Sequence, residues 1–350
     1  MKTLKVKGIN ILVKYHYQGY EKVVFFSCSE SKVEGIIAIH NTTFGPALGG
    51  CRIYTYSNFN EGLNDALMLA KNMSYKNTIF DLPYGGGKTV IFNKENLNKQ
   101  DILQVLSQVL NYLNGIYLTT DDVGTSVGDI KYLRQFTPYA RGEFVEDNMQ
   151  IPATSYGVYK AIKAILHGYS IDDPTKIKIS IQGLGKVGYN LCKFLYDDGY
   201  KLYVSDIKED LVRQAEKEFQ AIAVNTETQL EEMTDIFVPC AMGGVITPHN
   251  IFGIKAKYIV GAANNSLTYE YLDNILWEKN IKYFPDYLCN AGGVIDIACE
   301  GEFYSEDYVY NSIDAIYKKV LDLVNTSVKS NVSPMSILNH YIQNNFQTIK

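Results

Sequence analysis

The segment that most constrains the fold of this chain is a short apolar run followed by the glycine motif GLGKVG, residues 183–188. Residues 177–182 before the motif predict a buried strand, and residues 187–199 predict a helix. A second strand is expected at residues 201–207. Strand, glycine turn, helix and strand make a βαβ unit, which places the two strands parallel in one sheet. The segment therefore predicts an α/β fold with a parallel, doubly wound sheet.

The same segment indicates a dinucleotide-binding site of the Rossmann type. The GxGxxG pattern is weak by itself, but here it ends a strand and opens a helix, whose positive end suits a pyrophosphate. Asp206 ends the next strand, where a carboxylate binds the adenosine ribose and repels a 2′-phosphate, which favours NAD over NADP. Alternatively, Asp206 caps a turn. Lys186 either neutralises the pyrophosphate or points to solvent, and Lys208 would tolerate some NADP.

The length of 350 residues favours two domains. In the first third, strands are expected at residues 23–27 and 35–40, and helices at 60–73 and 100–113. Apolar residues at helical spacing predict a helix at 156–168, which places a domain boundary near residue 150. We therefore expect an α/β domain at 1–150, the Rossmann domain at 151–300, and C-terminal helices at 301–350. Those helices either cap the second domain or cross back to the first.

Composition excludes several classes of partner. The net charge is -5 and charges of both signs are interspersed, so neither nucleic acid nor an anionic membrane is expected. No run approaches the ~20 apolar residues of a membrane-spanning helix, and the first 20 residues lack the pattern of a signal peptide. The six cysteines have no metal-ligand spacing, which predicts reduced thiols, no metal site and a cytoplasmic protein.

Candidate chemical groups cluster in three glycine- or lysine-containing segments that we predict to be loops. These are GPALGGCR (residues 45–52), MSYKN (73–77) and YGGGKT (84–89). They contain Lys76 and Lys88, and TTDDVG (119–124) adds two carboxylates. Taken one at a time, such lysines are usually solvated and such aspartates usually cap turns.

Taken together, the ordered motifs resemble one family. They are IIAIHNTTFGPALGGCR, ALMLAKNMSYKN, GGGKTVI, LTTDDVGTSVGD, PATSYGVYKAIKA, QGLGKVGYNLC, DIFVPCAMGGVI, GAANNSL and PDYLCNAGGVID. From about residue 35 to residue 300, the chain resembles the leucine, valine and phenylalanine dehydrogenases of the glutamate dehydrogenase superfamily. The resemblance implies an enzyme that oxidatively deaminates an L-amino acid to the 2-oxo acid and ammonia with NAD. It also implies a homo-oligomer, with the first domain as the oligomerisation domain.

The resemblance further implies a role for each polar group of the first domain. Lys76 would bind the substrate α-carboxylate, with the backbone of Gly49 and Gly50 nearby. Lys88 would assist the attacking water and polarise the developing carbonyl, because desolvation and a neighbouring cation favour the neutral, basic form of a lysine. Asp122, rather than the adjacent Asp121, would bind the α-amino group and move its proton.

Other positions follow from the same resemblance. The expected pocket positions are Leu48, Met73, Thr120, Val294 and Ile297, and Asn265 is expected to orient the substrate. The expected cofactor positions are Gly183, Gly185, Lys186, Val187, Gly188, Asp206, Ile207, Thr154, Cys240, Ala241, Ala262, Asn264 and Asn290. The aliphatic pocket favours leucine, isoleucine or valine. Because Thr120 adds a hydroxyl and one methylene decides only ~1–3 kcal/mol, an aromatic amino acid is the alternative substrate, and no cation is available for an acidic one.

Two other functions remain open from the sequence. One is a catalytically silent NAD-binding or assembly protein, which would need none of Lys76, Lys88 and Asp122. The other is a 2-hydroxy acid dehydrogenase, which would need a His/Arg pair, whereas the histidines lie outside the matched loops.

Overall fold

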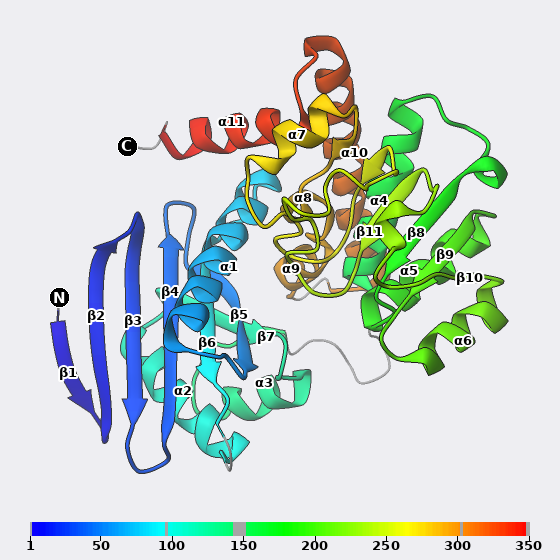
Figure 1. Ribbon diagram of the computed structural model, residues 1–350. Coiled ribbons are helices and arrows are strands. Elements are labelled where there is room, and N and C mark those ends of the chain that lie inside the picture. The colour runs from blue at the N-terminus through cyan, green and yellow to red at the C-terminus, as the bar shows by residue number, and fades with distance from the viewer. Residues whose placement is uncertain (1, 95–96, 143–151, 302–303, 348–350) are drawn as a thin grey trace. The chain divides into compact units, whose positions relative to one another are not determined.

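The computed structural model describes residues 2–94, 97–142, 152–301 and 304–347. The described residues form two compact units (Figure 1): the first contains residues 2–142 with 300–301, and the second contains 152–299 and 304–347. The domain boundary predicted near residue 150 lies within 143–151, outside the described residues. No helix in the described ranges is long and apolar enough to cross a membrane.

The first unit is a seven-stranded sheet with helices on both faces (Figure 1). Its strand order is β1-β2-β3-β4-β6-β5-β7. The strands are β1 (Lys2–Val6), β2 (Ile9–Tyr17), β3 (Tyr20–Cys28), β4 (Val33–Asn41), β5 (Ala47–Tyr54), β6 (Gly85–Phe92) and β7 (Tyr117–Asp121). The helices are α1 (Phe59–Ile79), α2 (Lys99–Leu113) and α3 (Val127–Arg134). β5 lies between β6 and β7 and is parallel to both, so the carboxyl ends of the three strands meet at one edge.

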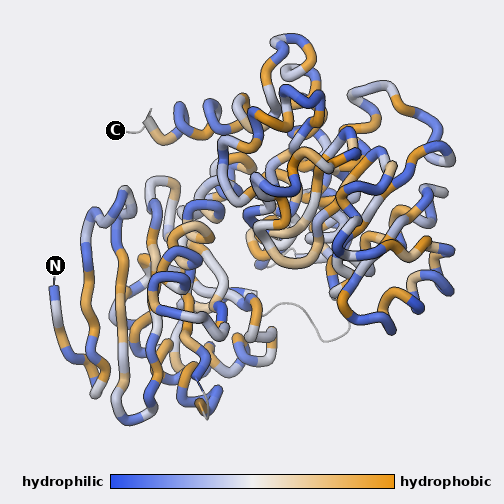
Figure 2. Tube along the Cα trace, viewed as in Figure 1, coloured by the Kyte–Doolittle hydropathy of each residue, from blue (hydrophilic) through white to orange (hydrophobic). Residues whose placement is uncertain are grey.

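Alternating side chains fill two separate cores in this unit. Ile37, Ile39 and Ile91 pack with α2 on one face, and Ile36 and Val90 pack with α1 on the other. A sheet covered on both faces has strands that are apolar throughout, which explains the run GIIAI in β4. In Figure 2 the outer strands instead alternate hydrophobic and hydrophilic residues, as expected where only one face is covered.

The prediction that the three chemical segments are loops is wrong. Leu48, Gly49 and Gly50 lie in β5, Lys88 lies in β6, and MSYKN forms the C-terminal turns of α1. Glycine is needed in these strands because α1 and a buried ring press directly on them. A Cβ added at Gly86 would lie 2.1 Å from the backbone nitrogen of Ser74, and one at Gly87 would lie 2.7 Å from the ring of Tyr117.

The second unit has the Rossmann architecture that the sequence predicted. Its parallel sheet has the order β10-β9-β8-β11-β12-β13, the doubly wound order that reverses between β8 and β11. The strands are β8 (Lys178–Gln182), β9 (Lys201–Ser205), β10 (Ile222–Ala223), β11 (Ile236–Pro239), β12 (Tyr258–Ile259) and β13 (Lys282–Tyr283). The helices are α4 (Ala153–Gly168), α5 (Lys186–Asp197), α6 (Glu209–Phe219), α7 (Leu272–Glu278), α8 (Asp286–Cys289), α9 (Gly292–Ala298), α10 (Glu306–Ser330) and α11 (Pro334–Gln347).

The two C-terminal helices pack within the second unit. Lys160 of α4 forms a 2.9 Å ion pair with Asp314 of α10, and Gly157 of α4 leaves room for the side chain of Ile316. The segment before α11 is joined to α7 by a 2.5 Å hydrogen bond from Ser333 Oγ to Asp273 Oδ2. These helices therefore extend the core of the second unit.

Candidate active site

A buried lysine and a carboxylate meet at the carboxyl edge of the first sheet. Nζ of Lys88, in β6, donates a hydrogen bond to Oδ2 of Asp122, which directly follows β7. Gly50 of the intervening strand β5 makes this contact possible, because a Cβ there would lie 2.7 Å from Cβ of Asp122 and 3.2 Å from Lys88 Nζ. The neighbouring Asp121 is exposed and accepts a hydrogen bond from Thr120. The geometry thus pairs Lys88 with Asp122.

A second cation, which the sequence reasoning missed, binds the same carboxylate oxygen. Arg52 Nε donates to Asp122 Oδ2 at 3.0 Å, and Arg52 Nη1 donates to Asp65 Oδ2 of α1 at 2.9 Å. Tyr56 also donates to Asp65 Oδ2, at 2.5 Å. Arg52 belongs to the motif GPALGGCR, but an arginine on a predicted loop gave no reason to expect two half-buried carboxylate partners.

The charges of this cluster stabilise one another. Burial by itself would raise the pKa of Asp122, but Lys88 and then Arg52 hold it well below its usual range. Burial would lower the pKa of Arg52, and Asp122 and Asp65 raise it further above its usual value. The Asp122 carboxylate and the Arg52 guanidinium are therefore both charged at neutral pH.

The last turns of α1 bring Lys76 against the same sheet. Lys76 is buried, and its neighbour Asn77 donates from Nδ2 to the carbonyl of Gly85 at 2.6 Å, which ties the helix to the start of β6. Gly49 lies where a Cβ would be 1.7 Å from the carbonyl oxygen of Gly87. Tyr117, a residue the sequence did not single out, donates to the carbonyl of Gly49 at 2.7 Å. These contacts fix the strand backbone between the two lysines.

The predicted pocket residues lie on both units. Leu48 and Thr120 are buried in β5 and β7, and Met73 is half-buried on α1. Asn265, Val294 and Ile297 lie in the second unit, where Asn265 has a left-handed φ of 55° and α9 carries the other two. A pocket that combines both sets stays a prediction.

The glycine motif of the second unit forms a tight turn between β8 and α5. Gly183 has a φ of 93°, and a Cβ there would lie 2.7 Å from Cβ of Ala241, after β11. A Cβ at Gly188 would lie 1.9 Å from the carbonyl oxygen of Gly183. The helix begins at Lys186 after Gly185, which has no side chain to cap the first N–H groups. Such an end suits a phosphate group.

Asp206 lies beside this turn and is held by the backbone. Its Oδ2 accepts from the nitrogen of Leu184 at 2.6 Å and its Oδ1 from the nitrogen of Lys208 at 2.8 Å. Asp206 therefore makes the turn contacts of the alternative interpretation, and its binding to a ribose stays a prediction. Ile207, next in the chain, is 91% exposed.

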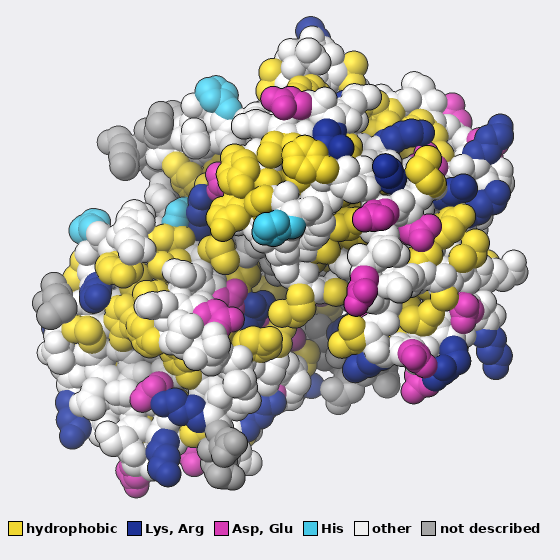
Figure 3. Space-filling model, in the orientation of Figure 1, with side chains coloured by type: hydrophobic (Ala, Val, Ile, Leu, Met, Phe, Trp, Pro, Cys, Tyr) yellow, Lys and Arg dark blue, Asp and Glu magenta, His cyan; other side chains and the backbone are white. Residues whose placement is uncertain are grey.

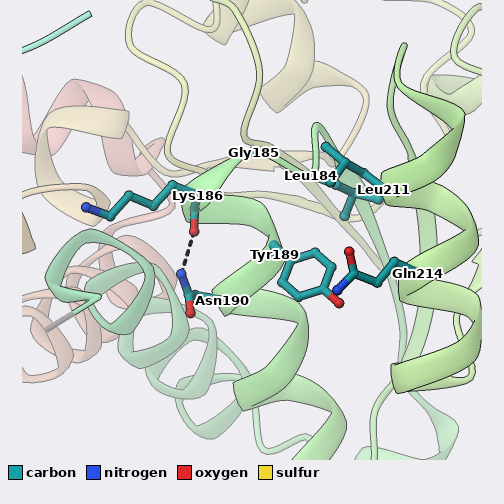
Figure 4. Close-up of a pocket in the computed structure, with 7 residues that line it drawn as sticks. All are labelled: Leu184, Gly185, Lys186, Tyr189, Asn190, Leu211 and Gln214. Carbon is teal, nitrogen blue, oxygen red and sulfur yellow. Dashed lines mark hydrogen bonds between the residues drawn. The ribbon is translucent and has the colours of Figure 1, made fainter. Parts of the chain in front are cut away.

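A cavity of about 400 Å³ opens next to the turn (Figure 4). It is lined by Leu184, Gly185, Lys186, Tyr189, Asn190, Leu211 and Gln214. In Figure 4 the side chain of Lys186 extends away from Tyr189, Leu211 and Gln214, while its carbonyl accepts a hydrogen bond from Asn190. The backbone of Lys186, rather than its charge, thus borders this cavity.

An asparagine cluster lies after β12 and α8. Asn290 Nδ2 donates to the carbonyl of Ala262 and to Oδ1 of Asn264, both at 2.9 Å. Asn290 follows α8 rather than a strand, and its buried Oδ1 has no hydrogen-bond partner among the described residues. A buried acceptor of this kind is suited to a ligand N–H group.

The remaining residues predicted to contact the cofactor lie at the same end of the second sheet or on helices beside it. Cys240 donates its backbone N–H to the carbonyl of Gln182 at 2.7 Å, which joins the ends of β11 and β8. Val187 accepts a hydrogen bond from Ser155 of α4 through its carbonyl. Thr154 lies against α9, since a Cβ at Gly293 would be 3.1 Å from its Oγ1.

Comparison with known proteins decides the family. The family model described as "Glu/Leu/Phe/Val dehydrogenase, dimerisation domain" matches residues 21–139, and the one described as "Glutamate/Leucine/Phenylalanine/Valine dehydrogenase" matches 148–222 and 203–346. The chain belongs to this dehydrogenase family. The predictions of family, fold class and an amino-acid dehydrogenase are thereby confirmed. Dehydrogenases of this superfamily use a nicotinamide cofactor.

Individual relatives cover nearly the whole chain. The leucine dehydrogenase of Geobacillus stearothermophilus is 38% identical over 336 residues, which is 95% of this chain and 92% of that protein. The L-tryptophan dehydrogenase of Nostoc punctiforme is 36% identical over 90% of each chain. The crystal structure of L-tryptophan dehydrogenase from that organism superimposes with a TM-score of 0.78 at 34% identity, covering 95% of this chain and 96% of the other.

Proposed function

We propose that this dehydrogenase catalyses the reversible oxidative deamination of a branched-chain L-amino acid, leucine, isoleucine or valine, with NAD. The observation that carries the proposal is the contact between the buried Lys88 and the half-buried Asp122, because a protein that only bound a dinucleotide would not need it. Burying a charge is costly unless it is paired, so a fold gains little from such a pair without a chemical use. The leucine dehydrogenase of Geobacillus stearothermophilus, at 38% identity, supports the branched-chain substrate.

The first unit supplies the groups that bind the amino acid in this proposal. Lys76 binds the α-carboxylate, with the N–H groups of Gly49 and Gly50 nearby. Leu48, Met73 and Thr120 contact the side chain. From the second unit we assign Asn265, Val294 and Ile297 to the same substrate.

Two groups of the first unit manage the protons. Asp122 binds the α-ammonium and accepts its proton, so that the amine lone pair can stabilise the carbon as it becomes an imine. Lys88, whose own ammonium proton has passed to solvent, then removes a proton from the water that adds to the imine carbon. Asp122 returns a proton to the leaving ammonia. When bound, the nicotinamide ring supplies the acceptor for the hydride of the α-carbon.

The second unit has the features that a dinucleotide requires. The close approach of Gly183 to Ala241 and the start of α5 suit the pyrophosphate. Asp206 would bind the adenosine ribose, and its charge favours NAD over NADP. The buried Oδ1 of Asn290 suits the amide group of the nicotinamide. We assign Ile207, Cys240, Ala241, Ala262, Asn264 and Thr154 to the walls of this site.

An aromatic amino acid is the second candidate substrate, because the L-tryptophan dehydrogenase of Nostoc punctiforme is 36% identical over 90% of this chain. The deciding quantity is the ratio of kcat/KM for leucine to kcat/KM for tryptophan and phenylalanine. Mixing the purified protein with NAD or NADP and each common amino acid, and recording NADH or NADPH absorbance, measures it. We expect turnover with NAD and a branched-chain substrate; absence of turnover with every amino acid would contradict the enzyme assignment.

We further propose a cytoplasmic homo-oligomer whose ligands are an amino acid and its 2-oxo acid. The family model for the first unit describes a dimerisation domain, which supports oligomerisation. All six cysteines are free thiols, which supports a reducing compartment. On the face shown in Figure 3, basic and acidic side chains are interspersed rather than gathered into a patch, which gives no footprint for nucleic acid.

A further inference from the structure

Arg52 occupies an unusual position in the first unit, between two carboxylates. Its Nε lies 3.0 Å from Asp122 Oδ2 and its Nη1 lies 2.9 Å from Asp65 Oδ2. The Arg52 side chain is 15% exposed, so this bridge is largely shielded from water and from salt. Tyr56 donates to the same oxygen of Asp65 and holds the outer end of the bridge. The guanidinium is thus fixed at both ends, on β5 between the end of β7 and α1.

Arg52 and Lys88 share a single oxygen atom, Oδ2 of Asp122. The two cations differ in one chemical respect: a lysine can lose its proton in a protein, whereas an arginine stays charged. While both are charged, Lys88 and Arg52 together neutralise the negative charges of Asp122 and Asp65. When Lys88 gives up its proton, Arg52 is the cation that remains on Asp122.

We propose that Arg52 is a positioning residue for the catalytic pair: it orients Asp122 and favours its ionised form, so that Asp122 releases the proton that it accepts, and Asp65 anchors Arg52. The inference rests on the proposed deamination, because it assigns Arg52 a part in that reaction. Without Arg52, Asp122 would retain the proton that it receives from the substrate, and the pair would return to its starting state more slowly.

The other titratable groups around Asp122 do not replace Arg52. Burial raises the pKa of the Cys51 thiol of β5 to about 12, and burial also raises the pKa of the Tyr117 phenol of β7. Both groups are therefore neutral at physiological pH. Asp121 follows the same strand but is exposed to solvent. Among the described residues, Lys88 and Arg52 are the cations whose charges lower the pKa of Asp122.

The test compares Arg52→Gln and Arg52→Lys with the wild type in the full-length protein. Lys94→Gln is the matched control, because it removes a cation from an exposed ion pair with Glu34 in the same unit. One readout is the pH profile of kcat/KM with the amino acid that the wild type prefers. The other needs no substrate: the infrared carboxyl band of Asp122, identified by its loss in Asp122→Asn, is followed as the pH is lowered.

In Arg52→Gln, we expect the Asp122 carboxyl to titrate about one pH unit higher or more, since an opposite charge at this range lowers a carboxyl pKa by about 1–3 units. The acid limb of kcat/KM should move in the same direction, and kcat should fall about tenfold or more. Arg52→Lys should keep the acid limb near that of the wild type, with a lowered kcat, because an ammonium cannot bridge both carboxylates. Lys94→Gln should match the wild type in the carboxyl titration, in the acid limb of kcat/KM and in kcat.

Circular dichroism and NADH binding show whether Arg52→Gln is folded. If it is folded and neither its Asp122 carboxyl titration nor its acid limb of kcat/KM moves, the proposal is overturned. If that variant does not fold, Arg52→Lys decides: an unchanged kcat overturns the proposal, and a lowered kcat with the acid limb retained supports it. A wild-type protein that turns over no amino acid contradicts the proposed function instead. The infrared titration still tests the coupling of Arg52 to Asp122 in that case.

Discussion

Two buried carboxylates show how surroundings decide the charge of a residue. Asp122 lies beside Lys88 and Arg52, which hold its pKa well below the usual range despite its burial. Asp273 of α7 is buried, but it accepts its hydrogen bond from the neutral hydroxyl of Ser333, and burial raises its pKa to about 6. Asp122 is therefore ionised at neutral pH, as the proposed chemistry requires. Asp273 instead destabilises the folded state once it ionises.

Asp273→Asn should therefore change stability in a pH-dependent way. Because the folded state binds the Asp273 proton more tightly, the free energy of unfolding of the wild type falls as pH rises from about 4 to about 6. The variant lacks this loss, so above pH 6 we expect it to be the more stable, by at most about 3 kcal/mol at ~1.4 kcal/mol per pKa unit. Urea unfolding at pH 4 and pH 7.5 measures the difference. An advantage of equal size at both pH values would contradict the assignment.

At the scale of elements, helix α1 packs directly on the strands β5 and β6 because these strands carry glycines. The backbone nitrogen of Ser74 occupies the space that a side chain at Gly86 would fill. This close approach brings the helix turn that carries Lys76 next to the strand that carries Lys88. The glycines are thus part of how the site is built.

Gly86→Ala should destabilise the protein by about 1–3 kcal/mol, the usual cost of overpacking. Its added Cβ would lie 2.1 Å from a backbone atom, so the helix or the strand must move. Gly128→Ala in α3 is the control, where the nearest atom would lie 3.7 Å away and the helix should gain about 0.5–1 kcal/mol. Thermal unfolding of both variants measures the effect. Equal effects of the same sign would contradict the packing argument.

The sequence predicted those elements whose periodicity is undisturbed by glycine. The sequence predicted β3, β4, α2 and the β8-α5-β9 unit as the correct type of element. In these segments the apolar spacing and the turn residues indicate the same structure. The strands β5 and β6 were predicted as loops, because glycines selected by tertiary packing look the same in sequence as glycines selected by turns. The family motifs in the sequence pointed to both Lys88 and Asp122. No sequence spacing pointed to the pair of Arg52 and Asp65.

At the scale of the whole molecule, each unit has its own sheet and core, and each supplies a different part of the proposed chemistry. The groups that exchange protons lie in the first unit, and the features suited to a dinucleotide lie in the second. The first unit also carries the segment matched by the dimerisation-domain model. Its outermost strand β1 is paired only with β2 in the described chain, and an open sheet edge of this kind can pair with another copy.

The purified protein should accordingly be a homo-oligomer. Light scattering coupled to size-exclusion chromatography should give a mass that is a multiple of 39.5 kDa and is independent of added NAD. A mass of 39.5 kDa at micromolar concentration would contradict the oligomer.

The central claim is that Lys88, paired with Asp122, carries out the chemistry at a site that is distinct from the dinucleotide-binding turn. The most direct test is to measure turnover and NADH affinity of Lys88→Ala beside the wild type and Lys94→Gln, whose lysine lies in an exposed ion pair. We predict that Lys88→Ala loses about 100-fold or more in kcat, as expected for a lost general base, while its NADH affinity stays within a factor of about three of the wild-type value. Retained turnover, or a loss of NADH binding equal to the loss of activity, would contradict the account.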